Sequence, residues 1–355
     1  GDGAFKYSGL KSIHLNKKVQ FIGNSAFAGT NIKNLQMGEN VLYIGNKVFA
    51  SCTSLKTIYI PANVKGINAN AFNDCSSLRE IRVAAGNKNY CAKDGVLYNK
   101  SMTKLIQYPL HKTNRSFHVP SSVRTVRSNS FNDNNYLRNL TISAGAIGNY
   151  AFQGMTKLRT VRITQGTKKI GKEAFLGCRR LSRIDIADSV KTIGDYAFSE
   201  TNIGVAHIPS GLVKMNANAF SRCDKMSAFT GGGGRFTVKD GVLYNGPMTR
   251  LMKYPPKKNT KSFTVPRSVK YVSSEAFDRV SHLTKLYFEK GIKSLPYNCI
   301  YKVKNLKSIV FASGTKLKNG EYAVGDCPKL AVIVGPNSYP IRRMAYYASA
   351  TLITL

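Results

Sequence analysis

Acidic residues are scarce in this sequence. Its 355 residues include 18 Asp and Glu against 53 Lys and Arg, which gives a formal net charge of +35. The carboxylates are too few and too dispersed to predict a catalytic pair. A charge of this size opposes compaction by self-repulsion, and it favours anionic partners such as acidic glycans, cell-wall polymers, nucleic acid or anionic membrane surfaces.

Long apolar runs are also missing. No stretch of 18 or more apolar residues occurs, so the sequence predicts no membrane-spanning helix. No signal peptide is visible at Gly1, and the chain opens inside a repeating pattern, so we expect that sequence upstream of Gly1 has been cut away. With 43% hydrophobic residues, the chain can nevertheless bury a continuous core.

Motifs that carry enzyme chemistry are lacking. The nearest phosphate-loop pattern, at 166–172, is followed by Glu173 where a Ser or Thr must reach Mg²⁺. The glycine run at 231–234 opens no helix that could hold a phosphate. The five histidines stand singly, without a His-x-x-x-His pair for zinc, and Gly-x-Ser-x-Gly is absent. The sequence therefore predicts no enzyme, no metal site and no cofactor.

What the sequence has instead is an internal repeat. A large apolar residue, here called the anchor, recurs mostly every 21 to 24 residues, with Ile or Val five residues before it and Leu six residues after it. Such fixed offsets are the signature of a repeat architecture. The anchors are Phe5, Phe27, Phe49, Phe72, Phe131, Phe152, Phe175, Phe198, Phe220, Phe277, Ile300, Val324 and Tyr346.

One repeat shows how the pattern predicts structure. Residues 55–60 form a Leu-x-x-Ile-x-Ile run, which predicts a short strand with alternate side chains pointing inward. Pro61 ends this strand because it lacks an N–H group. Stacked repeats would pair such strands into a parallel sheet at about 4.8 Å per step and share one long core. We predict that Phe72, Phe152 and Phe175 are buried in one continuous aromatic spine.

Two steps between anchors are long, and both hold a copy of one insert. The segments 93–99 and 239–245 each read Lys-Asp-Gly-Val-Leu-Tyr-Asn. Each predicts a β-hairpin, in the first copy with a strand at 95–99, a turn near Ser101 and a return strand through Leu105. We expect hairpins at about 87–119 and 233–265 to project from the stack and leave the flanking repeats adjacent.

The repeat pattern resembles the BspA-like class of leucine-rich repeats over essentially the whole chain. The insert sequence also resembles an element that recurs in that family. The pattern reads Ile-Pro-x-x-Val-x-x-Ile-x-x-x-Ala-Phe-x-x-Cys-x-x-Leu-x-x-Ile, and one copy of it is carried by Ile60, Pro61, Val64, Ile67, Ala71, Phe72, Cys75, Leu78 and Ile81.

This resemblance implies a repeat solenoid that is mainly β, a right-handed superhelix with a parallel β-sheet and two inserted β-hairpins. It implies a single leucine-rich-repeat domain over 1–355 with about 13 repeats. It also implies a non-enzymatic, surface-exposed or secreted protein of a bacterium or protozoan parasite, with a role in adhesion. Ile300, Val324 and Tyr346 replace the usual Phe, so we expect looser packing near the C-terminal end.

Five of the seven cysteines share one repeat position, three residues after the anchor. Neighbours such as Cys52 and Cys75 would lie about one strand spacing apart, so distance does not exclude a disulfide. Small residues fill this position in other repeats, which favours buried free thiols. The five are Cys52, Cys75, Cys178, Cys223 and Cys327.

Basic residues also recur at fixed offsets. Most of the candidate anion-binding residues follow the Leu that opens a repeat, and the rest lie close by: Lys11, Lys33, Lys56, Arg79, Arg82, Arg138, Arg159, Arg162 and Arg183. A second row, after the conserved Val of the repeat, consists of Lys65, Arg124, Lys168, Lys191, Lys214 and Lys270. Either the rows form a track for a polyanion, or the repeats have simply copied a solvated cation.

Two functional classes therefore stay open. One is an adhesin that binds a host extracellular matrix protein or cell-surface protein through the sheet and the hairpins. The other is a binder of anionic polysaccharide, such as a glycosaminoglycan or cell-wall polymer. No motif that reads nucleic-acid bases is present. Salt would separate the classes, because charge-driven binding weakens steeply as ionic strength rises.

Overall fold

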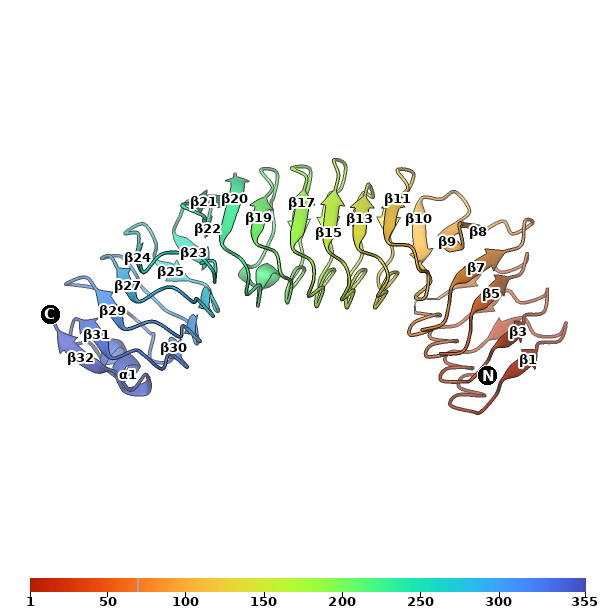
Figure 1. Ribbon diagram of the computed structural model, residues 1–355, viewed down its shortest axis with the longest axis horizontal. Coiled ribbons are helices and arrows are strands. Elements are labelled where there is room, and N and C mark those ends of the chain that lie inside the picture. The colour runs from red at the N-terminus through yellow and green to blue at the C-terminus, as the bar shows by residue number, and fades with distance from the viewer. Residues whose placement is uncertain (69) are drawn as a thin grey trace. The chain divides into compact units, whose positions relative to one another are not determined.

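The computed structural model describes residues 1–68 and 70–355 and is built almost entirely of β-strands. The chain divides into two compact units, Gly1–Leu181 and Ser182–Leu355. Within each unit the chain winds into stacked coils whose strands pair in parallel, so each is a β-solenoid (Figure 1). The predicted repeat solenoid is thus confirmed.

In the first unit most coils have a main strand on one side and a two-residue strand on another. The main strands are β1 (Ser12–His14), β3 (Asn34–Gln36), β5 (Thr57–Ile60), β7 (Glu80–Val83), β11 (Ser116–Val119), β13 (Asn139–Ile142) and β15 (Thr160–Ile163). The short strands are β2 (Phe21–Ile22), β4 (Tyr43–Ile44), β6 (Gly66–Ile67), β12 (Thr125–Val126), β14 (Ala146–Ile147) and β16 (Lys169–Ile170).

Repeat position sets the register of these strands. Ser12 pairs with Asn34, and Ser116 pairs with Asn139, so residues at the same offset lie side by side. Within a strand the side chains alternate: Ile58 and Ile60 are buried, whereas Tyr59 between them is exposed. The main strands therefore present one outward side chain for every inward one, and the outward set forms regular columns.

The anchor rings stack inside the first unit, but in two runs. One run, with centroid separations of 5.4, 5.7 and 6.0 Å, consists of Phe5, Phe27, Phe49 and Phe72. The other, with separations of 4.7, 4.7 and 5.0 Å, consists of Tyr108, Phe131, Phe152 and Phe175. Phe72, Phe152 and Phe175 are all buried. The prediction of one continuous aromatic spine is wrong, because no ring pair among the described residues joins the two runs.

The inserts explain the break. The antiparallel pairing of β9 (Val96–Asn99) with β10 (Lys104–Gln107) agrees with the predicted hairpin, and β8 (Tyr90–Lys93) adds a third antiparallel strand. β10 then pairs in parallel with β12 and continues the stack of short strands. Leu97 and Ile106 join the core of the preceding coils, and Tyr108 supplies the ring of the next coil. The expectation that the inserts project from the stack is wrong, because their apolar side chains are needed inside it.

The second unit repeats this organisation. Its main strands are β17 (Arg183–Ile186), β19 (Val205–Ile208), β24 (Ser262–Val265), β27 (Lys285–Phe288), β29 (Ser308–Phe311), β31 (Val332–Gly335) and β32 (Thr351–Thr354). The insert supplies β20 (Ala228–Gly233), β21 (Phe236–Lys239), β22 (Val242–Asn245) and β23 (Arg250–Lys253). The remaining elements are β18 (Thr192–Ile193), β25 (Tyr271–Val272), β26 (Phe277–Asp278), β28 (Ile300–Tyr301), β30 (Val324–Gly325), the 3₁₀ helix η1 (Ala217–Phe220) and α1 (Tyr339–Tyr347).

The C-terminal anchors behave differently from one another. Ile300 and Val324 are buried and pair in parallel through β28 and β30, so an aliphatic residue fills the anchor position without exposing it. Tyr346 lies in α1 and is 70% exposed, whereas Met344 and Ala345 of the same helix are buried. The assignment of Tyr346 as an inward anchor is therefore wrong, because a helix replaces the final turn of the coil.

The cysteines are free thiols. Cys75 and Cys178 are fully buried, and each donates a hydrogen bond to the carbonyl of the anchor one coil earlier, at 3.0 and 3.1 Å. Burial raises the pKa of the Cys178 thiol to about 12. The favoured interpretation of buried thiols is confirmed for Cys52, Cys75, Cys178 and Cys223, whereas Cys327 is only half-buried.

Candidate functional site

A row of basic side chains lies at the start of the main strands of the first unit. Each directly precedes its strand, because it follows the residue that opens the repeat. The backbone N–H of Lys33 donates to the carbonyl of Lys11 at 2.8 Å, and that of Arg79 donates to Lys56 at 2.8 Å. All four side chains are exposed. The row therefore advances with the coils, as its sequence offset predicts.

The first insert divides this row. The backbone N–H of Arg138 donates to the carbonyl of Arg115 at 2.7 Å, and that of Arg159 donates to Arg138 at 2.7 Å. The prediction that the repeats of Arg79 and Arg138 are adjacent is wrong, because the coil of Arg115 precedes Arg138. Sequence reasoning missed Arg115 because Asn114 stands where other repeats have Leu or Ile. The sequence offered one signal for a repeat at Arg115, which is the alternation of apolar and polar residues in the strand that follows it.

The other candidate residues are placed differently. Arg82 lies within β7 and its Nη2 is 2.9 Å from Oε2 of Glu80, which holds the pKa of that carboxyl below its usual value. Arg162 is exposed within β15, and Arg183 is exposed at the start of β17 in the second unit. The structure thus brings the nine residues together only in groups. Those before the first insert are Lys11, Lys33, Lys56, Arg79 and Arg82, and those after it in the same unit are Arg138, Arg159 and Arg162.

The second basic row lies next to the short strands. In the first unit Lys65, Arg124 and Lys168 directly precede β6, β12 and β16, and all three are exposed. These residues are positively charged like those of the first row but are attached to a different side of the coils. They provide a matched comparison for any test of the first row.

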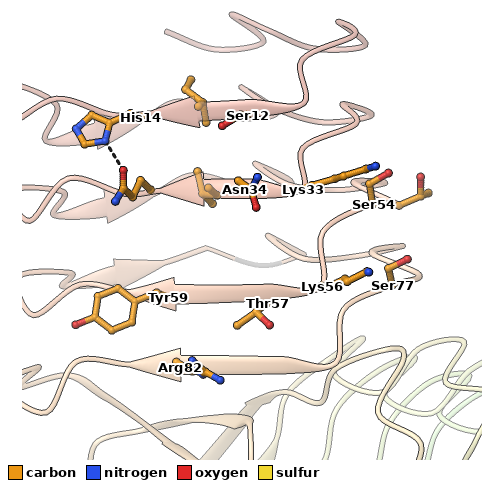
Figure 2. A pocket seen from close by; sticks show the side chains of 14 residues that line it. Ser12, His14, Lys33, Asn34, Ser54, Lys56, Thr57, Tyr59, Ser77 and Arg82 are labelled. Atoms are coloured by element: carbon orange, nitrogen blue, oxygen red, sulfur yellow. Dashed lines mark hydrogen bonds between the residues drawn. The ribbon is translucent and has the colours of Figure 1, made fainter.

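The face of β1, β3, β5 and β7 carries a groove of about 900 Å³. Figure 2 shows that its side chains come from successive strands and that those at equivalent repeat positions lie in columns. The columns are His14, Gln36, Tyr59 and Arg82; Ser12, Asn34 and Thr57; and Lys33 and Lys56, with Ser54 and Ser77 beside them.

The groove is positively charged. Lys33 and Lys56 line one side of it and Arg82 closes the end at β7, while the described residues of its lining include no acidic side chain. Glu80, which pairs with Arg82, is outside that lining. An anionic group in the groove would therefore meet two lysines that have no competing carboxylate within the lining.

The groove also presents unused hydrogen-bonding groups. Nδ1 of His14 lies 2.6 Å from Oε1 of Gln36, and no other side-chain bond of either residue occurs in the part of the chain that the structure describes. Asn34 and Thr57 make no side-chain hydrogen bond to any described residue. The corresponding column after the insert is different, because Asn139 donates to Ser116 at 3.2 Å and accepts from Thr160 at 2.7 Å.

A smaller basic pocket of about 320 Å³ lies at the start of β11 and β13. Arg115, Arg138, Lys157 and Arg180 line it, together with Tyr136, and its described lining contains no acid. Sequence reasoning selected only Arg138 of these four cations. Lys157 and Arg180 precede the opening Leu of their repeats instead of following it, so the offset that defined the row passed over them.

Two other kinds of site were sought over residues 1–68 and 70–355. No cluster of three His, Cys, Asp or Glu side chains there has the arrangement of a metal site. None of the helices in that part of the chain is long and apolar enough to cross a membrane.

Parallel coils with buried Leu and Ile at fixed offsets define the class of leucine-rich-repeat proteins. The model of the BspA type leucine rich repeat region matches residues 1–104, 110–227 and 256–353, in six copies. The chain belongs to this family, as its repeat pattern predicts. No curated protein matches the chain in sequence.

Solved structures with this fold come from several bacteria. A leucine rich cell surface protein from Faecalibacterium prausnitzii is 22% identical, with 88% of this chain and 83% of that one covered and a TM-score of 0.58. A leucine-rich repeat protein from Eubacterium ventriosum is 25% identical over 76% of each chain, with a TM-score of 0.57. One from Bacteroides ovatus is 16% identical over 100% of this chain and 86% of that one, with a TM-score of 0.53.

Proposed function

We propose that this protein is a non-enzymatic binding scaffold, displayed on a cell surface or secreted, that adheres to a host matrix protein or to other cells. Membership of the BspA type family supports a binding role, and one structural relative is a cell surface protein. The observation that carries the proposal is the outward face of the main strands in the first unit, where polar, aromatic and basic side chains stand in columns across the strands.

A second candidate is binding of an anionic polymer through the basic row. It is favoured by the exposure of Lys11, Lys33, Lys56 and Arg79 in one row before the first insert. Each exposed contact contributes little, about 1 kcal/mol or less, so only a linear ligand that meets several cations at once would bind measurably. The same row would speed the approach of an acidic protein, so the candidates share one surface.

An array of matrix proteins and glycans, probed at about 50 and 200 mM salt, tests both candidates, because charge screening differs between these conditions. Adhesion through apolar and hydrogen-bonded contacts predicts that binding to one or more matrix proteins persists at the higher salt. Polyanion binding predicts signals on sulfated and uronic-acid glycans that fall steeply with salt. Absence of binding to every protein and glycan of the array at low salt would contradict both candidate functions.

A further inference from the structure

We propose that the groove on β1, β3, β5 and β7 is a binding site for a short saccharide that carries carboxylate or sulfate groups. This inference rests on the proposed binding function and names a ligand class for one part of the strand face. It concerns a groove that is lined by an exposed aromatic ring, that of Tyr59, as well as by cations. The basic row alone would attract any extended polyanion.

Tyr59 gives the groove a flat apolar surface. Its side chain is 45% exposed although it lies between the buried Ile58 and Ile60, because the alternation of the strand directs it outward. An exposed aromatic ring inside a polar groove is a favourable partner for the C–H face of a sugar, which is apolar while its edge carries hydroxyls. The neighbouring outward residue across β7 is Arg82, in register with Tyr59.

The second element is a set of neutral polar groups around this ring. Asn34, Thr57 and Gln36 offer both donors and acceptors, and none of these side chains is saturated by described residues. Sugar hydroxyls also donate and accept, so they match amide and hydroxyl side chains better than they match lysines alone. The column Ser116, Asn139 and Thr160 has the same chemistry, but its members bond one another.

Charge and spacing complete the assignment. Lys33 and Lys56 stand along one side of the groove, where they would meet carboxylate or sulfate groups that project from the sugar. Parallel strands place successive side chains about 4.8 Å apart, a step similar to the length of one sugar in a linear polysaccharide. Successive sugars would therefore meet side chains of successive coils, with one of them at the Tyr59 ring.

A peptide fits this groove less well. Peptides that bind sheets commonly add a strand and use main-chain hydrogen bonds at an open edge. The groove lies across the faces of two strand pairs, β1 with β3 and β5 with β7, and the groups that line it in columns are side chains. An acidic peptide would be held by the lysines without any use for the Tyr59 ring.

The test measures the affinity of the full chain for oligogalacturonate and for a heparin hexasaccharide, with a neutral gluco-oligosaccharide and poly-glutamate as comparisons. Variants are Tyr59→Ala, Tyr59→Phe and Asn34→Ala. Their matched controls are Tyr43→Ala, which removes a tyrosine that is 44% exposed on β4, and Asn139→Ala in the saturated column. Thermal melting confirms that each variant is folded.

We expect an acidic saccharide to bind and Tyr59→Ala to weaken it by about tenfold, the effect of losing one aromatic contact. Tyr59→Phe and both controls should stay close to wild type, while Asn34→Ala weakens binding. Saturation transfer from the protein should reach the ring protons of the sugar and should be weaker in Tyr59→Ala.

Three results would overturn the inference. If no saccharide binds at low salt, the site does not exist. The proposed adhesion to matrix proteins is tested separately, by the array of matrix proteins. If saccharides bind but Tyr59→Ala and Tyr43→Ala behave alike, the surface is a polyanion track without a sugar site. If poly-glutamate binds as tightly as oligogalacturonate, charge alone selects the ligand.

Discussion

At the scale of single residues, the repeat position three residues after the anchor, where five of the cysteines lie, shows which side chains the core accepts. The thiols of Cys52, Cys75 and Cys178 donate to the carbonyls of Phe27, Phe49 and Phe152, each one coil earlier. Two repeats have Thr at this position, and there the hydroxyl donates to the carbonyl of its own anchor. Where the position holds Cys or Thr, the side chain both fits the core and donates a hydrogen bond inside it, whereas Met155, Val280 and Val303 fill the same position in other repeats without a donor.

Substitution of Cys178 by Thr or by Val separates the effect of size from that of the hydrogen bond, since Thr and Val have the same shape but only Thr can donate. We expect Cys178→Val to be less stable than Cys178→Thr by about 1 kcal/mol, the net value of a buried hydrogen bond. Denaturant unfolding measures the difference. Equal stability of the two variants would mean that size alone determines this position.

Lys253 in the second insert is a residue that the repeat pattern does not explain. It is 2% exposed, and its ammonium group donates to the backbone carbonyl of Glu275 at 2.8 Å. Burial lowers the pKa of Lys253 and raises that of nearby Asp278. In the first insert the corresponding residues are Gln107 and Asn132, which carry no charge.

We expect Lys253→Gln to remove a pH dependence. Because the pKa of Lys253 is lower in the folded chain than its usual 10.5, the unfolded chain binds more protons at alkaline pH. The stability of the wild type relative to Lys253→Gln should therefore rise with pH up to about 10.5 and then level off. Unfolding curves from pH 7 to 11 test this, with Lys253→Gln/Asp278→Asn as the charge-free reference. Parallel curves for wild type and Lys253→Gln would contradict it.

At the scale of elements, the inserts behave as parts of the stack. Tyr108 and Tyr254 are buried and lie against the anchors Phe131 and Phe277 at 4.7 and 5.4 Å between centroids. Each insert thus supplies a coil whose anchor is Tyr, reached through antiparallel strands. This coil is the physical reason that each insert is packed into the stack and does not project from it.

Tyr108 tests this role directly. We expect Tyr108→Ala to cost about 3–5 kcal/mol, as for Phe175→Ala, because both truncate a buried ring of the same run. The Tyr108 hydroxyl has no hydrogen-bond partner among the described residues, so Tyr108→Phe should be neutral or stabilising. Tyr254 donates to or accepts from Thr260, so Tyr254→Phe should cost about 1 kcal/mol.

Thermal and denaturant unfolding measure all four variants. If Tyr108→Ala lowers the free energy of unfolding by less than about 1 kcal/mol, Tyr108 is not a core residue, since exposed side chains contribute little. The first insert would then be the projecting hairpin that its sequence predicts.

The sequence predicts the coils well and the inserts poorly, for one reason. In ordinary repeats a residue such as Ile58 has equivalents at the same offset, so register and burial follow from counting. Tyr108 and Arg115 have no such equivalents around them, because Asn114 interrupts the pattern. Their places depend on the pairing of β10 with β12, which is a tertiary contact. The groove was missed similarly, because Tyr59 looks like any outward strand residue until its neighbours are known.

At the scale of the whole molecule, charge is the dominant property. A formal charge of +35 on 355 residues gives every surface of the chain some attraction for anions. The proposed binding surface therefore has to be distinguished from this general attraction. The position of a cation on the coils makes this distinction possible, because two basic rows lie on different sides of the first unit.

The most direct measurement compares reversal of these two rows. One variant carries Lys33→Glu, Lys56→Glu and Arg79→Glu on the strand face, and the other carries Lys65→Glu, Arg124→Glu and Lys168→Glu beside the short strands. Both change the net charge by the same amount, and retention on a heparin column is followed as salt rises. If the strand face binds, the first variant elutes at clearly lower salt than the second, because several adjacent contacts are lost together. Equal elution of the two variants would show that net charge alone governs binding and would contradict the proposed surface.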